Sequence, residues 1–325
     1  MTRIHSAAAP RAAFCAIDFG TSNSAIALSS QEGRMALVEV EPGQRTMPTA
    51  VFYQTEDLAA HEEPRQIFGR PALAAYVEGH EGRLMRSMKS ILGSALAEQS
   101  TDVGAGRSVR YLDVVSGYLL HLKQLAERDA GAPLTRAVLG RPVYFVDDDP
   151  VRDGKAQQAL ENAARAVGLR ELSFQYEPIA AALDYEQSVQ QEELVLVADI
   201  GGGTSDFSLV RVGAERRQRL DRKDDILANH GVHVAGTDFD RHVELASILP
   251  LCGYRGRGPQ RPGEAPREVP SRVYFDLATW HLINTVYSQQ RMAELRRMRD
   301  FYGDPRQYAR LMRVLDERLG HALIG

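Results

Sequence analysis

The chain contains one short motif twice, and this repeat constrains its fold more than any other feature. Each copy is an apolar strand that ends in an aspartate, followed by a glycine turn with small hydroxyl residues and then by a second strand. The copies read AIDFGTSNSAIAL (16–28) and ELVLVADIGGGTSDFSLVRV (193–212). Two such hairpins far apart in one sequence predict an internal duplication, with two similar lobes whose turns face each other across a cleft.

Length and composition favour a cytoplasmic α/β protein. The 325 residues, 44% of them hydrophobic, suffice for two domains or for one domain divided by a cleft. The net charge of -4 without a long run of one sign argues against nucleic-acid or membrane partners. The two cysteines, Cys15 and Cys252, predict neither a disulfide framework nor a metal knuckle. No apolar stretch is long enough to predict a signal peptide or a membrane span.

Hydrophobic spacing between the copies predicts helices packed on sheets. One helix runs through Val115, Tyr118, Leu119, Leu122 and Leu125 and ends near Gly131, and a second covers 156–167. Segments 97–108 and 256–270, rich in glycine and polar residues, predict surface loops. The sequence from Phe275 onward predicts a long helix or a helix pair, and the polar stretch 187–193 predicts the boundary between the lobes.

The two turns have the composition of phosphate-binding loops. Glycines and hydroxyl residues expose backbone N–H groups that can surround phosphate oxygens. Asp18 and Asp199 would then supply negative charge for a magnesium ion, which keeps several waters. Either turn alone is equally typical of an ordinary hairpin.

A third element lies between the copies. In YEPIAAALDYE (176–186), Glu177 and Pro178 start a helix whose alanines at 180–182 permit close packing. A purely structural role explains the same residues: the alanines would allow a tight helix crossing, and Glu177 would interact favourably with the helix dipole at the N-terminus.

These segments, taken in order, resemble a known family. AIDFGTSNS, EPIAAALDY, ADIGGGTSDFS and GVHVAGTDFD are similar to the first phosphate, connecting and second phosphate motifs, and the segment after them, of the DnaK-type heat shock protein 70 family. The region FDLATWHLINTVYSQQRMAELRRMRDFYG looks most like its YegD-like branch. The resemblance implies an α/β actin-like ATPase fold, with duplicated ribonuclease H-like lobes around a nucleotide cleft. The lobes would be 1–191, with a small subdomain at about 48–118, and 192–325.

The resemblance also implies site roles, with ATP or ADP and Mg²⁺ as cofactors. Asp18 and Asp199 would bind the metal through water, Glu177 and Asp206 would order metal and attacking water, and Lys89 would approach the terminal phosphate. Asp199 counts among the catalytic groups as well. Nucleotide-binding positions would be Gly20, Thr21, Ser22, Asn23, Gly201, Gly202, Gly203, Thr204 and Gly236. The chain has four lysines against thirty-five arginines, which favours a specific role for Lys89 because an ammonium is a compact charge.

The sequence departs from the family pattern in three ways. The family signals through a proline, here Pro142, and a relay arginine, but FVDDDPVRDGKAQQAL places Gln157 at the arginine position. The second lobe is expected to be incomplete, because the adenine and ribose elements do not occur. No peptide-binding domain is expected either.

Two other clusters favour structural roles. Asp147, Asp148 and Asp149 before Pro150 predict a loop that leads into a helix rather than a calcium site. His230 and His233 lack further ligands and predict a strand and a turn.

The favoured function is an ATP-binding and ATP-hydrolysing chaperone-family protein, with client proteins or cochaperones as possible partners. An actin-like filament protein and a nucleotide-free interaction module derived from the ATPase fold are the alternatives. A sugar or acid kinase would need an acceptor-activating base, which the sequence does not reveal.

Overall fold

The computed structural model describes residues 14–29, 35–59, 62–217, 219, 223–232, 234–260, 263, 265–280 and 282–323. His233 and the start of the chain lie outside these residues. The chain divides into two compact units, Met1–Val234 and Ala235–Gly325, and each is described by itself. The lobe boundary predicted at 187–193 falls within the first unit, between two sheets, and stays a prediction. None of the described helices has the length and apolar content needed to cross a membrane.

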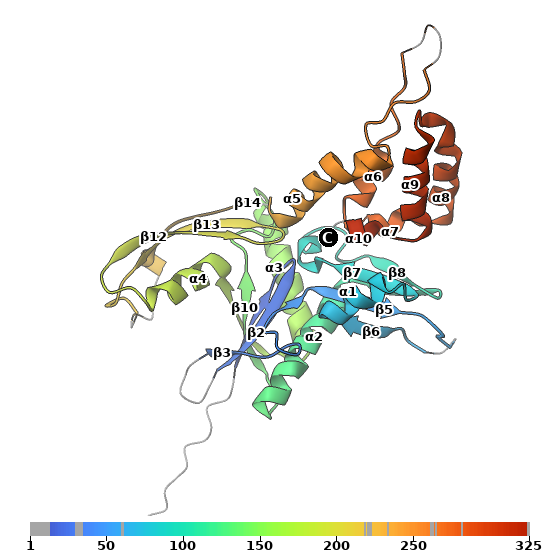
Figure 1. The fold of residues 1–325 in the computed structure, drawn as a ribbon. Helices are drawn as coiled ribbons and strands as arrows, with labels where there is room; N and C mark the ends of the chain where they lie inside the picture. Colours follow the sequence, from blue (N-terminus) through green and yellow to red (C-terminus); the bar gives the residue numbers. More distant parts are fainter. Residues whose placement is uncertain are drawn as a thin grey trace, which may run out of the picture. The chain divides into compact units, whose positions relative to one another are not determined.

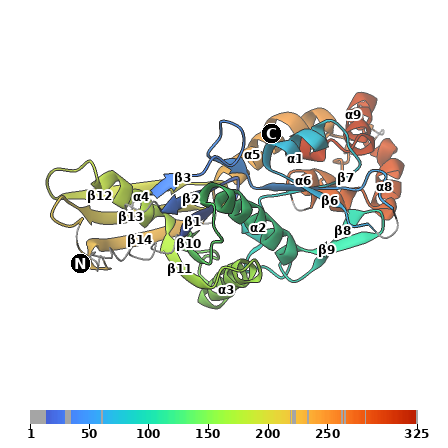
Figure 2. The same cartoon turned by 90° about the horizontal axis from the view of Figure 1, so that it is seen from below.

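The first predicted hairpin is confirmed and lies inside a six-stranded sheet of order β11-β10-β1-β2-β3, seen from two sides in Figure 1 and Figure 2 and with all five strands labelled in Figure 2. β1 pairs antiparallel with β2 and parallel with β10, so both of its edges are hydrogen-bonded. The strands are β1 (Cys15–Phe19), β2 (Asn23–Ser29), β3 (Met35–Leu37), β10 (Arg136–Arg141) and β11 (Glu171–Tyr176), with the short β4 (Met47–Pro48) paired to β2.

Two long helices accompany this sheet. α2 (Tyr111–Ala130) buries four of the five residues of the predicted apolar stripe, with Leu125 half-buried, and packs Tyr118 against Phe19 of β1 with the rings tilted and their centroids 5.8 Å apart. It ends at Gly131, where φ of +64° favours glycine, as the sequence predicts. α3 (Pro150–Ala166) starts earlier than predicted because the Asp149 side chain accepts a hydrogen bond from the Arg152 amide at 3.0 Å. This capping bond confirms that the aspartate run leads into a helix.

A smaller sheet with its own core lies within the first unit (Figure 2). Its strands are β5 (Ala50–Gln54), β6 (Arg65–Phe68) and β7 (Gly82–Arg86), with α1 (Gly69–Val77) packed on it and the 3-10 helix η1 (Met88–Ile91) following. The loop predicted at 97–108 is wrong, because β8 (Ser100–Gly104) and β9 (Arg107–Arg110) form a hairpin there. Its turn is Ala105–Gly106, and Gly104 is the last residue of β8; both glycines have the positive φ that glycine adopts readily, so they shape a tight hairpin and not a long loop.

The second predicted hairpin is also confirmed. β12 (Glu193–Ile200), β13 (Ser205–Val212) and β14 (Ile226–Val232) form an antiparallel sheet, and the 3-10 helix η2 (Lys223–Asp225) leads into β14. α4 (Glu177–Glu186) packs on one face, where Ala182, Val210 and Val212 share a core with Val195 and Val197 (Figure 1). Ala182 is buried, but Ala180 and Ala181 are exposed, so only one of the three alanines packs closely.

The second unit is helical and has its own core of Tyr254, Tyr274, Leu277, Leu311 and other apolar side chains. The long helix or helix pair predicted from Phe275 is wrong. Extended backbone at Ser288 and Tyr302, and a new helix start at Pro305, divide this region into short helices. The helices are α5 (Gly236–Val243), π-helix η3 (Glu244–Ile248), η4 (Leu249–Cys252), α6 (Arg272–Leu277), α7 (Ile283–Val286), α8 (Gln289–Arg296), η5 (Arg297–Phe301), α9 (Pro305–Asp316) and α10 (Gly320–Leu323).

Candidate phosphate and metal site

The first glycine loop joins β1 to β2 and is held from behind by Thr49. The Thr49 hydroxyl donates to the Gly20 carbonyl at 2.8 Å and contacts the Ser24 hydroxyl at 2.8 Å, while the Thr49 amide donates to the Ser22 carbonyl at 2.9 Å. A Cβ at Gly20 would lie 2.1 Å from the Asn23 carbonyl oxygen, so the turn requires glycine there. Sequence reasoning missed Thr49, whose only signal was its place in the polar segment TMPT.

The second glycine loop joins β12 to β13 and lies directly against the first. The Gly201 amide donates to the Thr204 carbonyl at 2.9 Å and closes the loop. A Cβ at Gly202 would lie 2.1 Å from Ser22 Oγ, and one at Gly203 would lie 2.6 Å from Thr21 Oγ1. The two turns therefore face each other, as the repeat predicts, and glycine is what permits this approach.

An ion pair lies close to these loops. Lys89 of η1 donates from Nζ to Glu177 Oε1, the first residue of α4, at 2.6 Å. The Lys89 side chain is 6% exposed and that of Glu177 is 19% exposed, so the pair is held away from bulk water. The ion pair thus joins η1 to the start of α4, although the two residues are 88 positions apart in the sequence.

Asp18 lies within the electrostatic reach of this pair. Burial of its carboxyl, followed by the negative charges of Glu177 and Asp199, raises the pKa of Asp18 to about 6, and Lys89 opposes the shift. Asp18 keeps accessible surface, although the surrounding protein atoms still desolvate its carboxylate. The end of β1 is therefore electrostatically coupled to the end of β12.

Asp206 is a buried carboxylate on β13, directly opposite Asp199 on β12. Its Oδ1 accepts a hydrogen bond from the Val143 amide at 2.8 Å. Burial raises the pKa of Asp206, and the hydrogen bonds from the Val143 amide and the Thr204 side chain oppose that shift. The second loop is thereby tied to the segment that follows β10.

The charge of this cluster suits a divalent cation that keeps its water. Four carboxylates, from Asp18, Glu177, Asp199 and Asp206, are electrostatically coupled to one another, and Lys89 pairs with Glu177 and acts on Asp18. Within the described parts of the chain, no three His, Cys, Asp or Glu side chains are arranged to ligate a metal directly. Magnesium held largely through water by one or two carboxylates and a phosphate fits this donor set.

Sequence reasoning also missed Arg141, which is buried at the end of β10 and bonds the Pro142 carbonyl at 3.0 Å. The Arg-Pro pair in GRPVYF, at the end of a strand, was the available signal. Gly236 begins α5 in the second unit, and its predicted nucleotide contact stays a prediction.

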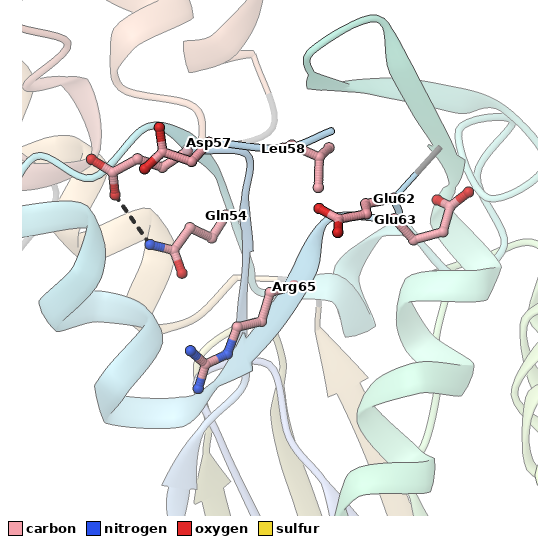
Figure 3. A pocket seen from close by; sticks show the side chains of 7 residues that line it. Gln54, Asp57, Leu58, Glu62, Glu63 and Arg65 are labelled. Carbon is pink, nitrogen blue, oxygen red and sulfur yellow. Dashed lines mark hydrogen bonds between the residues drawn. The ribbon is translucent and has the colours of Figure 1, made fainter. Parts of the chain in front are cut away.

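A separate pocket of about 430 Å³ lies at the loop between β5 and β6 (Figure 3). Its lining residues are Gln54, Glu56, Asp57, Leu58, Glu62, Glu63 and Arg65. None of them belongs to the predicted nucleotide site, and Glu56 is already paired with His80 at 2.8 Å. The pocket therefore adds nothing to the phosphate site.

A repeated strand–aspartate–glycine hairpin, with both loops in contact beside acids and one lysine, defines the class of this protein. It is the arrangement of the actin-like ATPase fold, which was predicted from the sequence.

Comparison with known proteins identifies the family. The family model described as Hsp70 protein matches residues 14–245, so the chain belongs to the Hsp70 family. The chaperone protein DnaK of Mycoplasmoides gallisepticum is 30% identical over 231 residues, which cover 70% of this chain and 34% of that protein. DnaK of Mesomycoplasma hyopneumoniae is 28% identical over 229 residues, which cover 70% of this chain and 33% of that protein.

A plant relative gives the same picture. The chloroplastic heat shock 70 kDa protein 7 of Arabidopsis thaliana is 30% identical over 240 residues, covering 70% of this chain and 31% of that protein. The match thus spans about a third of the length of these curated relatives. Their names support a chaperone-family protein with an ATPase fold.

Proposed function

We propose that this protein binds ATP or ADP with Mg²⁺ and hydrolyses ATP. The observation that carries the proposal is the direct contact between the glycine loops of the two hairpins. Backbone amides of both loops would then surround one polyphosphate chain.

The surrounding side chains support distinct roles for this reaction. Asp18 and Asp199, at equivalent places in the two hairpins, would hold the hydrated metal, which when bound neutralises charge on the phosphate oxygens. Lys89 would leave Glu177 to approach the terminal phosphate as a compact positive charge. Glu177 and Asp206 would orient the attacking water by accepting its hydrogen bonds.

Positioning and charge neutralisation provide most of the catalysis in phosphoryl transfer. An enzyme of this kind needs few reactive groups, and the carboxylates of Asp18, Glu177 and Asp199 lie at the ends of strands and at the start of a helix. Client proteins and cochaperones are further proposals that rest on the family alone, and a cytoplasmic location is a proposal that rests on the family and on the small number of cysteines.

Titration calorimetry with Mg-ATP and Mg-ADP, followed by measurement of phosphate release, tests the proposal. We expect saturable binding, and a fall in turnover of about 100-fold in Lys89→Ala, because a charge aimed at the transferred group is removed. Lys155→Ala, which removes an exposed lysine of α3, is the matched control and should turn over normally. Absence of binding heat, or equal rates in both variants, would contradict the proposal.

A further inference from the structure

Arg141 is a buried arginine that organises the segment following β10. The residue is 8% exposed, and its guanidinium lies 5.2 Å from the ring centre of Phe145 and 5.1 Å from that of Tyr176. Tyr176 directly precedes Glu177 at the start of α4. The guanidinium thus makes cation–π contacts with one ring from the segment after β10 and one from the end of β11.

The same guanidinium binds backbone carbonyls of the segment after β10, here called the Pro142 turn (142–145), and a carboxylate of α3. Nε donates to the Pro142 carbonyl at 3.0 Å, and Nη2 donates to the Val143 carbonyl at 3.1 Å. Nη2 also pairs with both carboxylate oxygens of Asp153, at 2.9 and 3.1 Å. Asp153 Oδ1 in turn accepts from the Phe145 amide at 2.6 Å. Arg141 and Asp153 therefore fix the backbone from Pro142 to Phe145.

This fixed backbone carries the donor that holds Asp206. The Val143 N–H donates to Asp206 Oδ1. The carbonyl of the same residue accepts a hydrogen bond from Arg141. A Cβ at Gly231 of β14 would lie 2.7 Å from Asp206 Oδ1 and 3.3 Å from Val143 Cβ, so the strand packs tightly against this bond. The orientation of the Asp206 carboxylate thus depends on where the Val143 amide points.

We propose that Arg141 is a positioning residue for ATP hydrolysis, which acts through the Val143 amide to orient the Asp206 carboxylate. This inference rests on the proposed function, in which Asp206 orders the attacking water. Gln157 occupies the position where the family resemblance leads one to expect an arginine, and it accepts a hydrogen bond from Arg141 Nη1. The arginine that contacts Pro142 and Val143 therefore comes from the end of β10, and not from the α3 position where the resemblance leads one to expect it.

The fork geometry explains why arginine is required. Five N–H groups in one plane serve two carbonyls, a carboxylate and an amide oxygen at once. An ammonium offers three donors around one atom and does not stack in the same way. Arg141→Lys should therefore rescue only part of what Arg141→Gln loses.

The first test is a double-mutant cycle measured in steady-state ATP hydrolysis. Arg141→Gln should lower kcat about tenfold with KM for ATP within about twofold, because Arg141 acts on water placement and not on nucleotide contacts. In the Asp206→Asn background, Arg141→Gln should produce no further fall in kcat. Full additivity of the two substitutions would overturn the proposal.

The second test is independent of activity. Hydrogen exchange of the Val143 amide, measured by NMR without nucleotide, should become at least about tenfold faster in Arg141→Gln. Asp153→Asn, which preserves the shape of the side chain, should accelerate the same amide to a smaller extent. Unchanged Val143 exchange in Arg141→Gln would overturn the proposal.

Arg165→Gln on α3 is the matched control. Arg165 pairs with Glu161 at 2.6 Å and donates to the Arg170 carbonyl at 2.8 Å, with no bond to the Pro142 turn. It should leave both kcat and Val143 exchange unchanged. If the wild type fails to hydrolyse ATP, the proposed function fails, while Val143 exchange still decides whether Arg141 positions the turn.

Discussion

The strands β1 and β12 begin the same motif but lie in different surroundings. When Asp18 is aligned with Asp199, Phe19 corresponds to Ile200. Phe19 is 1% exposed, whereas Ile200 is 58% exposed. Two positions with equivalent sequence roles thus differ almost completely in burial.

The neighbours of each strand account for the difference. β1 is hydrogen-bonded on both edges, by β2 and β10, and Tyr118 of α2 packs on Phe19. Among the described strands, β12 pairs with β13 alone, and its buried face is the one with Val195 and Val197 against α4. The motif therefore determines the shape of the loop, while the elements packed around it determine what each strand contributes to stability.

The largest expected effect is on the buried member of the pair. Phe19→Ala should reduce the free energy of unfolding by about 3–5 kcal/mol, because it leaves a cavity beneath α2. Ile200→Ala should cost less than about 1 kcal/mol, since most of that side chain is already in water. Urea titrations followed by circular dichroism measure both, and equal losses would show that the two strands are packed alike.

The contact between the loops gives an intermediate effect. Gly202→Ala places a Cβ where Ser22 Oγ lies, so it should cost about 1–3 kcal/mol and weaken any nucleotide binding. Gly201→Ala is the control for stability in the same loop, because its Cβ would meet nothing nearer than the Thr204 carbonyl oxygen at 3.5 Å. Thermal unfolding compares the two variants, and calorimetry with Mg-ATP compares Gly202→Ala with the wild type. A tolerated Gly202→Ala would show that the loops do not touch in solution.

The smallest expected effect concerns pH. The native pKa of Asp18, about 6, lies above the value near 4 expected in the unfolded chain, so the native state binds more protons between these values. Stability of the nucleotide-free protein should therefore fall as pH rises from about 4 through 6.

Asp18→Asn should reduce that slope, because it removes the Asp18 contribution and leaves that of Asp206, and it should stabilise the protein at pH 8 by on the order of 1 kcal/mol, a figure reduced for solvent screening. Asp199→Asn removes one of the charges that raise the pKa of Asp18, and it should weaken the slope without abolishing it. Unfolding curves at several pH values measure this. The same slope in wild type and Asp18→Asn would assign it to other groups.

The sequence predicted the parts of the fold that depend on local patterns. Both hairpins, the helix that ends at Gly131 and the helix start at Glu177 follow from residue spacing, glycine turns and helix-capping chemistry. The β8–β9 hairpin was missed because its turn glycines also suit a loop. The helices after Phe275 were joined wrongly, because the break at Ser288 carries no glycine or proline.

The site was only partly predictable for a related reason. Each residue of a motif can be located from its neighbours in sequence, as Asp18 and Asp199 were. Thr49 acts through the Gly20 carbonyl, 29 residues before it, and no local pattern reports that contact. Arg141 precedes Pro142 in a visible Arg-Pro pair, but its ion pair with Asp153 of α3 depends on how β10 and α3 meet. The pairing of Lys89 with Glu177 belongs to the same class, because it depends on how η1 and α4 meet.

The central claim is that both glycine loops hold one polyphosphate, and amide chemical shifts measured by NMR on addition of Mg-ATP test it most directly. We expect the amides of Gly20–Asn23 and of Gly201–Thr204 to shift together with a single saturation midpoint, and MgCl₂ alone not to reproduce the pattern. Shifts confined to one loop, or to neither, would contradict the account.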